Sequence, residues 1–81
     1  MKLFIINAHS LGHTIRDVRI QKGLTQAELG RQVQMHQKDI SILEHNAGNT
    51  KLSRLLAICA MLGLKMIIED DTGPAMGDDM W

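Results

Sequence analysis

The sequence predicts a small, mostly α-helical domain built from four short helices. Apolar residues recur at helical spacing in four stretches, and residues that favour helix starts and stops flank them. With 81 residues and one cysteine, the chain is near the lower limit for a self-sufficient core without disulfides. We therefore expect one domain that gains stability by forming a homodimer.

The first helix is expected over about residues 10–22, with Ser10 as its N-cap and Gly23 as its stop. Its apolar residues are Leu11, Ile15 and Val18. The preceding run at residues 3–6 is rich in β-branched and aromatic side chains and suits a strand. We expect residues 1–9 to form an N-terminal arm that contains this strand, either at a sheet edge or in a dimer.

Two further short helices with a tight turn between them are expected over residues 25–45. Thr25 is a good N-cap for the first, and Glu28 completes a Thr-x-x-Glu capping box that satisfies two orphan backbone donors. The second helix is expected to begin near His36. The expected buried residues are Ala27, Leu29, Val33, Met35, Ile40 and Leu43. Because each helix is too short to be stable alone, the two must brace each other across the turn.

Small residues such as Ala27 and Gly30 allow two such helices to cross closely, as in a helix-turn-helix unit. The second helix then presents a polar face outward. The residues of this face are His36, Gln37, Lys38 and Ser41. Side chains of these types read base edges or hold phosphates in a DNA major groove, and only one acid, Asp39, accompanies them. On pattern alone, the solvated face of an ordinary helical domain is the alternative.

A turn-rich loop at residues 45–50 leads to a fourth helix over about residues 51–62, which Gly63 ends. Its broad apolar face carries Leu52, Leu55, Leu56, Cys59 and Leu62. The following run at residues 65–69 (KMIIE) suits a second strand. Because an isolated two-stranded ribbon is marginal in water, we expect residues 64–70 to pair across a twofold axis as a dimerisation strand.

The formal net charge is zero, but the charges are segregated along the chain. Residues 1–68 carry nine Lys and Arg against four acids, a net charge of +5, and residues 69–81 carry five acids and no Lys or Arg, a net charge of −5. A basic body suits phosphate binding, more strongly in a dimer that presents two such surfaces to one duplex. An ordinary mixed surface is the alternative, and it fits this separation less well.

The sequence gives little support for an enzyme. His9 and His13 have i, i+4 spacing, but His9 is expected to precede the first helix and no third ligand is evident, so we expect solvated histidines and no metal or other cofactor. Cys59 lies in an apolar pattern and is expected to be a small buried residue in a reducing cytosol. The sequence contains no signal-peptide core and no apolar run long enough to cross a bilayer, so a cytoplasmic protein is expected.

The composition changes at residues 71–81 (DTGPAMGDDMW), which are rich in Gly and Asp and predict a flexible acidic tail. Met80 and Trp81 at its end have no core to pack against. A terminal Trp suits a pocket on a partner protein, because large aromatic side chains dominate binding hot spots. A solvated end without a function is the alternative.

Residues 11–63 resemble the phage-repressor-like (Cro/cI, or XRE) helix-turn-helix family. The matching residues are GLTQAELGRQV, Gln37, Ile40 and the run at 42–44. The resemblance implies a lambda-repressor-like domain of four helices at residues 10–63, in which Gln26 anchors a DNA phosphate. The residues that it places at the bases are His36, Gln37 and Lys38. It also implies that Arg19 and Glu44 form an ion pair that supports the fold.

Two residues depart from this family pattern. Gln34 occupies the turn position where the family usually has Gly, and the left-handed conformation of that position costs a residue with a Cβ about 1 kcal/mol. Ile42 stands where the family often has a polar side chain that faces DNA. Ile42 would then either contact a thymine methyl or rest against neighbouring protein.

The helix-turn-helix domain, the following strand and the tail that ends in Trp are together similar to the HipB-type antitoxins of hip toxin-antitoxin operons. The matching parts are GLTQAEL, Gln37, residues 40–41, the loop at 49–50, the KMIIE strand and Trp81. This resemblance implies a dimer that shares an intermolecular β-lid and represses its own operon. It also implies a HipA-like serine/threonine kinase toxin as the partner, with the terminal Trp entering the toxin.

We therefore expect a dimeric transcriptional autorepressor that is also an antitoxin. Phosphate contacts are expected from Gln26, Lys51 and Arg16, and base contacts from His36, Gln37, Lys38 and Ser41. Met80 and Trp81 are expected to contact the toxin. The alternative is a stand-alone Cro/cI-type repressor without a toxin partner, in which the tail only tunes expression or solubility.

Overall fold

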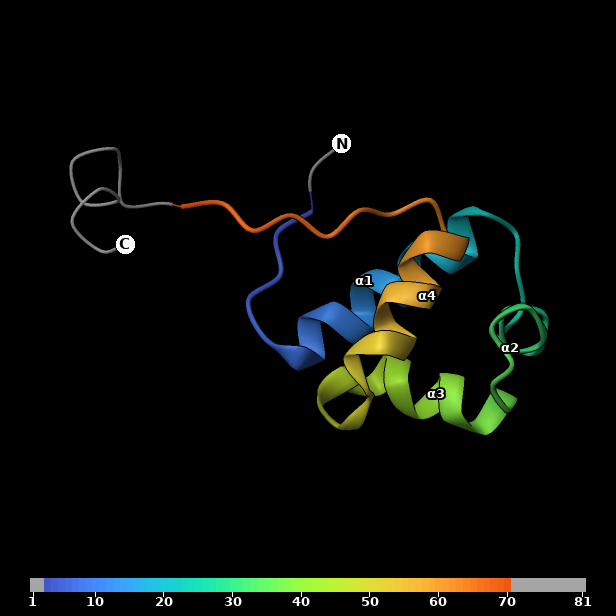
Figure 1. The fold of residues 1–81 in the computed structure, drawn as a ribbon. Helices are drawn as coiled ribbons and strands as arrows, with labels where there is room; N and C mark the ends of the chain where they lie inside the picture. Colours follow the sequence, from blue (N-terminus) through green and yellow to red (C-terminus); the bar gives the residue numbers. More distant parts are fainter. Residues whose placement is uncertain (1–2, 71–81) are drawn as a thin grey trace.

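The computed structural model describes residues 3–70, which form a mostly helical domain with four α-helices and one short 3-10 helix. The elements are α1 (Ala8–Gln21), α2 (Gln26–Val33), α3 (Gln37–His45), η1 (Ala47–Asn49) and α4 (Leu52–Met61). In Figure 1, α3 lies along the lower edge of the domain, with α1 and α4 above it and α2 beside its N-terminal end. The fold class expected from the sequence, a four-helix domain with a central helix-turn-helix, is confirmed.

The core is formed by residues from all four α-helices. Its fully buried large side chains are Ile15, Leu29, Ile40, Leu43, Ile58 and Leu62. The expected apolar face of α4 was partly wrong, because Leu52 and Leu56 are 63% and 47% exposed and Ile58 is buried instead. The core-facing side of α4 therefore carries residues 55, 58, 59 and 62, which repeat at the three- and four-residue spacing of one helical face.

The start of α1 differs from the sequence prediction. Asn7, not Ser10, is the N-cap, so the helix begins two residues earlier than expected. The Asn7 side chain accepts a hydrogen bond from the backbone N–H of Ser10 at 2.8 Å, and the Ser10 hydroxyl accepts one from the backbone N–H of Asn7 at 3.0 Å. This reciprocal capping box makes Ser10 the third residue of the helix, and it places His9 inside the helix rather than before it.

Two glycines allow the helices to approach each other closely. An added Cβ at Gly30 would lie 2.5 Å from the carbonyl oxygen of Met35, which agrees with the role expected for Gly30. An added Cβ at Gly12 would lie 2.4 Å from the carbonyl oxygen of Leu43. Gly12 was not singled out in the sequence, although it is the position where α1 rests on the backbone of α3.

The turn between α2 and α3 contains the backbone conformation that was expected to be unfavourable. Gln34 has φ 59° and ψ 46°, which is the left-handed helical region. Its backbone N–H donates to the carbonyl oxygen of Gly30 as in a helix, and the backbone N–H of Met35 donates to the same oxygen at 2.8 Å, which closes the end of α2. A glutamine therefore occupies a position that glycine would occupy at lower conformational cost.

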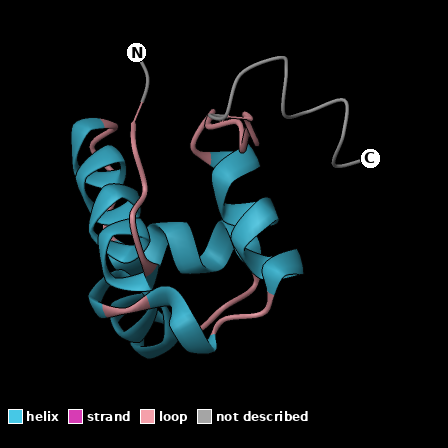
Figure 2. Cartoon of the chain, turned by 90° about the vertical axis from the view of Figure 1, so that its left-hand side faces the viewer, coloured by secondary structure: helices cyan, strands magenta, loops and turns pink. Residues whose placement is uncertain are grey.

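The segments at residues 3–6 and 64–70 have no regular secondary structure in the single chain, and Figure 2 draws no strand among the described residues. Both expose apolar side chains, including Phe4 (84%), Ile6 (87%) and Ile68 (100%). A β-strand requires a second strand to pair with, and residues 3–70 of the single chain contain no strand. The N-terminal arm, the dimerisation strand and the intermolecular β-lid therefore stay predictions.

Candidate nucleic-acid interface

The outward face of α3 carries the polar residues that the sequence assigned to DNA. His36 is the N-cap of α3, and no side-chain hydrogen bond is made by this cap. All four residues expected at the bases are exposed: His36, Gln37, Lys38 and Ser41. The opposite side of the helix is buried through Ile40, Leu43 and Glu44. A short helix held from behind and polar in front has the arrangement that a recognition helix needs to enter a major groove.

Ile42 belongs to the same outward face. It is 54% exposed, so within its own chain it does not pack into the core. The sequence left two roles open for Ile42. Its exposure makes the side chain accessible to a thymine methyl and also to a second protein chain.

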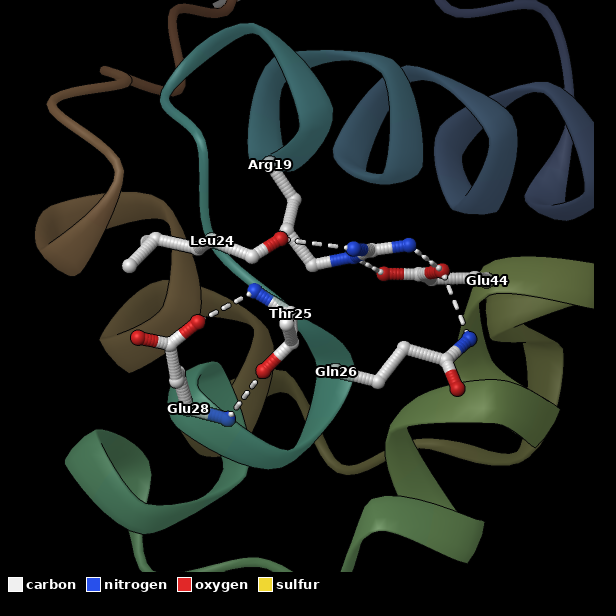
Figure 3. Close-up of polar contacts among 6 residues, drawn as sticks. All are labelled: Arg19, Leu24, Thr25, Gln26, Glu28 and Glu44. Carbon is white, nitrogen blue, oxygen red and sulfur yellow. Dashed lines mark hydrogen bonds and ion pairs between the residues drawn. The ribbon is translucent and has the colours of Figure 1, made fainter.

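A buried polar network fixes α3 to the helices that precede it. Arg19 Nε donates to Glu44 Oε2 at 2.6 Å, and Arg19 Nη2 donates to Glu44 Oε1 at 3.1 Å (Figure 3). Arg19 Nη1 also donates to the carbonyl oxygen of Leu24 at 2.8 Å. The exposed fractions of Arg19 and Glu44 are only 8% and 2%. This two-pronged ion pair therefore joins the end of α1, the α1–α2 loop and the end of α3.

Gln26 is connected to the same network at the N-terminal end of α2. Its Nε2 donates to Glu44 Oε1 at 3.1 Å, and its side chain is half-buried. A primary amide nitrogen carries two hydrogens, so this bond leaves Gln26 a second N–H that a phosphate oxygen could accept. Glu44 thus orients the amide that the sequence assigned to a phosphate.

Two adjoining hollows extend the polar surface beyond α3. One, of about 290 Å³, is lined by His13, Arg16, Gln26, Ser41, Glu44 and His45. The other, of about 690 Å³, is lined by Ser41, Ile42, His45, Asn46, Gly48 and Asn49. Because Ser41 and His45 line both, the hollows form one continuous surface. It brings together three residues that the sequence assigned to DNA: Arg16, Gln26 and Ser41.

The sequence analysis missed several residues of this surface. They are His13, His45, Asn46 and Asn49. The spacing of four residues from Ser41 to His45 could have indicated His45, since it places both on one side of α3. Asn46 caps η1 by accepting a hydrogen bond from the backbone N–H of Gly48 at 2.8 Å. The turn-rich composition of this loop predicted a turn but not its position beside α3.

The remaining assigned residues lie apart from this surface or beyond the described chain. Lys51 is exposed as the N-cap residue of α4 and lines neither hollow. Met80 and Trp81 lie outside the described residues 3–70. Among those described residues, no group of three or more His, Cys, Asp or Glu side chains is placed to hold a metal ion.

Two titratable groups have shifted pKa values. The pKa of Glu28 is lowered, mainly because its carboxylate accepts a hydrogen bond from the backbone N–H of Thr25 at 2.9 Å, and further because of the Thr25 side chain. This is the capping box that the sequence predicted at the start of α2. Burial raises the pKa of the Cys59 thiol, which keeps the thiol protonated and unreactive.

No helix in the described range has the length and apolar character needed to cross a membrane.

Comparison with known proteins identifies relatives of the whole domain. A family model described as a helix-turn-helix domain matches residues 10–66. The antitoxin HipB of Escherichia coli K12 is 35% identical over 66 residues, which cover 82% of this chain and 75% of that protein. A solved HipB–O4 20mer complex superimposes with a TM-score of 0.77 at 32% identity, covering 88% of this chain and all of the other. A HipA-HipB-O2-O3 complex gives a TM-score of 0.78 at the same identity and coverage.

Proposed function

The chain belongs to the HipB-like group of helix-turn-helix proteins, and from this premise we propose that it is a DNA-binding antitoxin and autorepressor. It binds operator DNA as a dimer and neutralises a HipA-like serine/threonine kinase toxin. Its solved relatives include HipB in a complex with an O4 20mer and HipB in a complex with HipA and O2-O3. We extend both partners to this chain.

The exposed polar face of α3, backed by the buried Arg19–Glu44 pair, is the observation that carries the DNA-binding part. Because the pair ties the C-terminal end of α3 to α1, the helix that carries the outward side chains is held in a fixed position. Gln37 is the residue best suited to a bidentate contact with an adenine, and Lys38 to a contact with a guanine. Gln26, Arg16 and Lys51 supply backbone contacts that set the register of the helix on the duplex.

The test compares a base contact with a phosphate contact on DNA from upstream of the chain's own gene. Gln37→Ala is expected to cost about 1–3 kcal/mol on the cognate site and to relax its sequence preference. Lys51→Ala is expected to weaken binding to all sequences alike and to lower the salt slope by about 1. Fluorescence anisotropy against the upstream duplex and a shuffled duplex measures both. Equal losses on the two duplexes for both variants would contradict the assignment.

Dimer formation rests on the exposed apolar segments at residues 3–6 and 66–68. An extended apolar segment can add to another chain as a strand, and a symmetric pair of such segments buries apolar side chains on both copies. We propose that residues 64–70 form the shared strand. A chain ending at residue 64 that still forms a tight dimer by light scattering would refute this.

The antitoxin part depends on the C-terminal residues Met80 and Trp81, and the stand-alone repressor is the alternative. Affinity purification of the tagged chain from its native host separates the two functions. An antitoxin should retain the kinase, and removal of Trp81 should weaken the complex without weakening operator binding. Operator binding without any retained kinase would favour the stand-alone repressor.

A further inference from the structure

Three histidines that are separate in the sequence are brought together where α1 packs on the end of α3. The ring centroids of His9 and His13 lie 4.3 Å apart, and the ring of His45 stands edge-on to His9 at 5.9 Å. His9 Nδ1 is 2.9 Å from the carbonyl oxygen of His45. Because a carbonyl only accepts, Nδ1 of His9 carries the hydrogen in this bond. We call these three residues the histidine cluster.

The histidine cluster is exposed and adjoins the surface described above. His13 and His45 line the same hollow as Arg16, Gln26 and Ser41, and His45 also lines the second hollow beside Ile42 and Asn49. The cluster is therefore not an isolated surface feature, because it lies beside residues already assigned to phosphates and bases. Its closeness to Gln26 and Ser41 places it at the edge of the surface that would face a duplex.

The charged groups around the cluster favour an anion. From α1, Arg16 lines the hollow and Asp17 follows His13 by one helical turn. From α3, Glu44 lines the hollow, but its carboxylate is paired with Arg19 and hydrogen-bonded by Gln26. The facing element η1 (Ala47–Asn49) has no titratable side chain, and α2 contributes only the Gln26 amide to the hollow. Of the two carboxylates named here, Asp17 is the one that is not paired with Arg19.

We propose that His13 and His45, beside Arg16, extend the contact with the phosphate backbone from Gln26 and Ser41 to the C-terminal end of α3, and that this histidine contact strengthens as the two rings become protonated. This inference rests on the proposed DNA binding and adds a contact surface to it. Histidine gains its positive charge between about pH 8 and pH 5, and only the protonated ring can donate from both nitrogens to phosphate oxygens. Binding is therefore strongest at low pH and weakens as the pH rises.

The test measures the affinity and salt slope of the full chain on a fluorescent duplex of arbitrary sequence, because backbone binding does not depend on sequence. Each phosphate neutralised adds about 0.9 to the slope of log K against log salt. For the wild-type chain, we expect the slope at about pH 6 to exceed that at about pH 8 by up to about 1.8 per subunit, with at least about tenfold tighter binding at low salt. The variant His13→Gln/His45→Gln should lose this difference.

Two further variants separate charge from packing. His13→Arg/His45→Arg carries a permanent charge and should show at pH 8 the slope that the wild-type chain reaches at pH 6. The matched control is Lys22→Gln, which removes a positive charge at the other end of the 14-residue α1 and should keep the full pH effect. Circular dichroism checks that each variant is folded.

The outcomes distinguish this site from the proposed function as a whole. Retention of the pH effect in His13→Gln/His45→Gln, or its loss in Lys22→Gln, would overturn the histidine contact while leaving DNA binding intact. A wild-type chain that binds the duplex equally at both pH values would overturn it as well. A chain that binds neither this duplex nor its own upstream DNA would overturn both proposals.

Discussion

The two helices of the helix-turn-helix begin in opposite ways. At the start of α2, Thr25 and Glu28 exchange hydrogen bonds at 2.9 and 3.0 Å. The backbone N–H groups of both residues therefore find acceptors within the chain. At the start of α3, His36 makes no side-chain capping bond, and the first-turn residues Gln37 and Lys38 are exposed. The difference indicates that α2 is built for stability, whereas the start of α3 keeps its polar groups for a partner.

The largest effect is expected at the buried Arg19–Glu44 ion pair, which holds α3 in place. Glu44→Ala leaves the Arg19 guanidinium buried without its carboxylate, which should lower the free energy of unfolding by about 3–5 kcal/mol. Urea denaturation measures the loss. The double variant Arg19→Met/Glu44→Met is the control, because it removes both charges and keeps the volume. It should be clearly more stable than Glu44→Ala, and equal losses would show that the isolated charge is not the cause.

The next largest effect on stability is expected at the N-caps of α2 and α3. Thr25→Ala removes an N-cap oxygen and should lower the free energy of unfolding by about 1 kcal/mol. His36→Ala removes a side chain that caps nothing and should change stability by much less, while it weakens operator binding. Thermal unfolding and anisotropy on both variants make the comparison direct. If His36→Ala destabilises the domain as much as Thr25→Ala, the start of α3 is a structural cap and the contrast fails.

A substitution in the turn between the two helices should stabilise the domain. Gln34→Gly relieves a side chain held at φ 59° and should raise the free energy of unfolding by up to about 1 kcal/mol. Gln32→Gly, inside α2, is the matched control and should destabilise the domain, because glycine is unfavourable in a helix interior. Denaturation midpoints of the two variants measure the sign of each change.

The smallest effect is a pH dependence confined to the start of α2. The lowered pKa of Glu28 means that its ionised form is favoured in the folded state, so its contribution to stability is present above the unfolded pKa and is lost as the pH falls through the folded pKa. Glu28→Gln keeps an acceptor without the charge. The stability difference between wild type and this variant should therefore shrink from neutral pH to about pH 3. A difference that stays constant would mean that the carboxylate charge contributes nothing.

Sequence reasoning was most successful where one residue type meets one local requirement. Thr25 and Glu28, the left-handed Gln34 and the close approach at Gly30 were all readable from the sequence. It failed at Ser10, where Asn7 offered an equally good cap three residues earlier. Local patterns rank such competing caps poorly, because a shift of three residues changes few apolar positions.

The parts of the candidate surface that escaped prediction are created by tertiary packing. His45 was treated as part of a loop, and His9 was placed before the first helix. The contact between them exists only because Gly12 lets α1 rest on the backbone of α3. Similarly, the exposure of Leu52 follows from the rotation of α4 about its axis, which its continuous apolar sequence does not specify.

The most direct test of the account is sedimentation of the purified chain with and without a duplex from upstream of its own gene, in dilute buffer. The account predicts a dimer in free solution and two chains on each half-site pair of the duplex, in a complex that sediments as one species. A chain that remains a single subunit and leaves the duplex free at the lowest salt would contradict it.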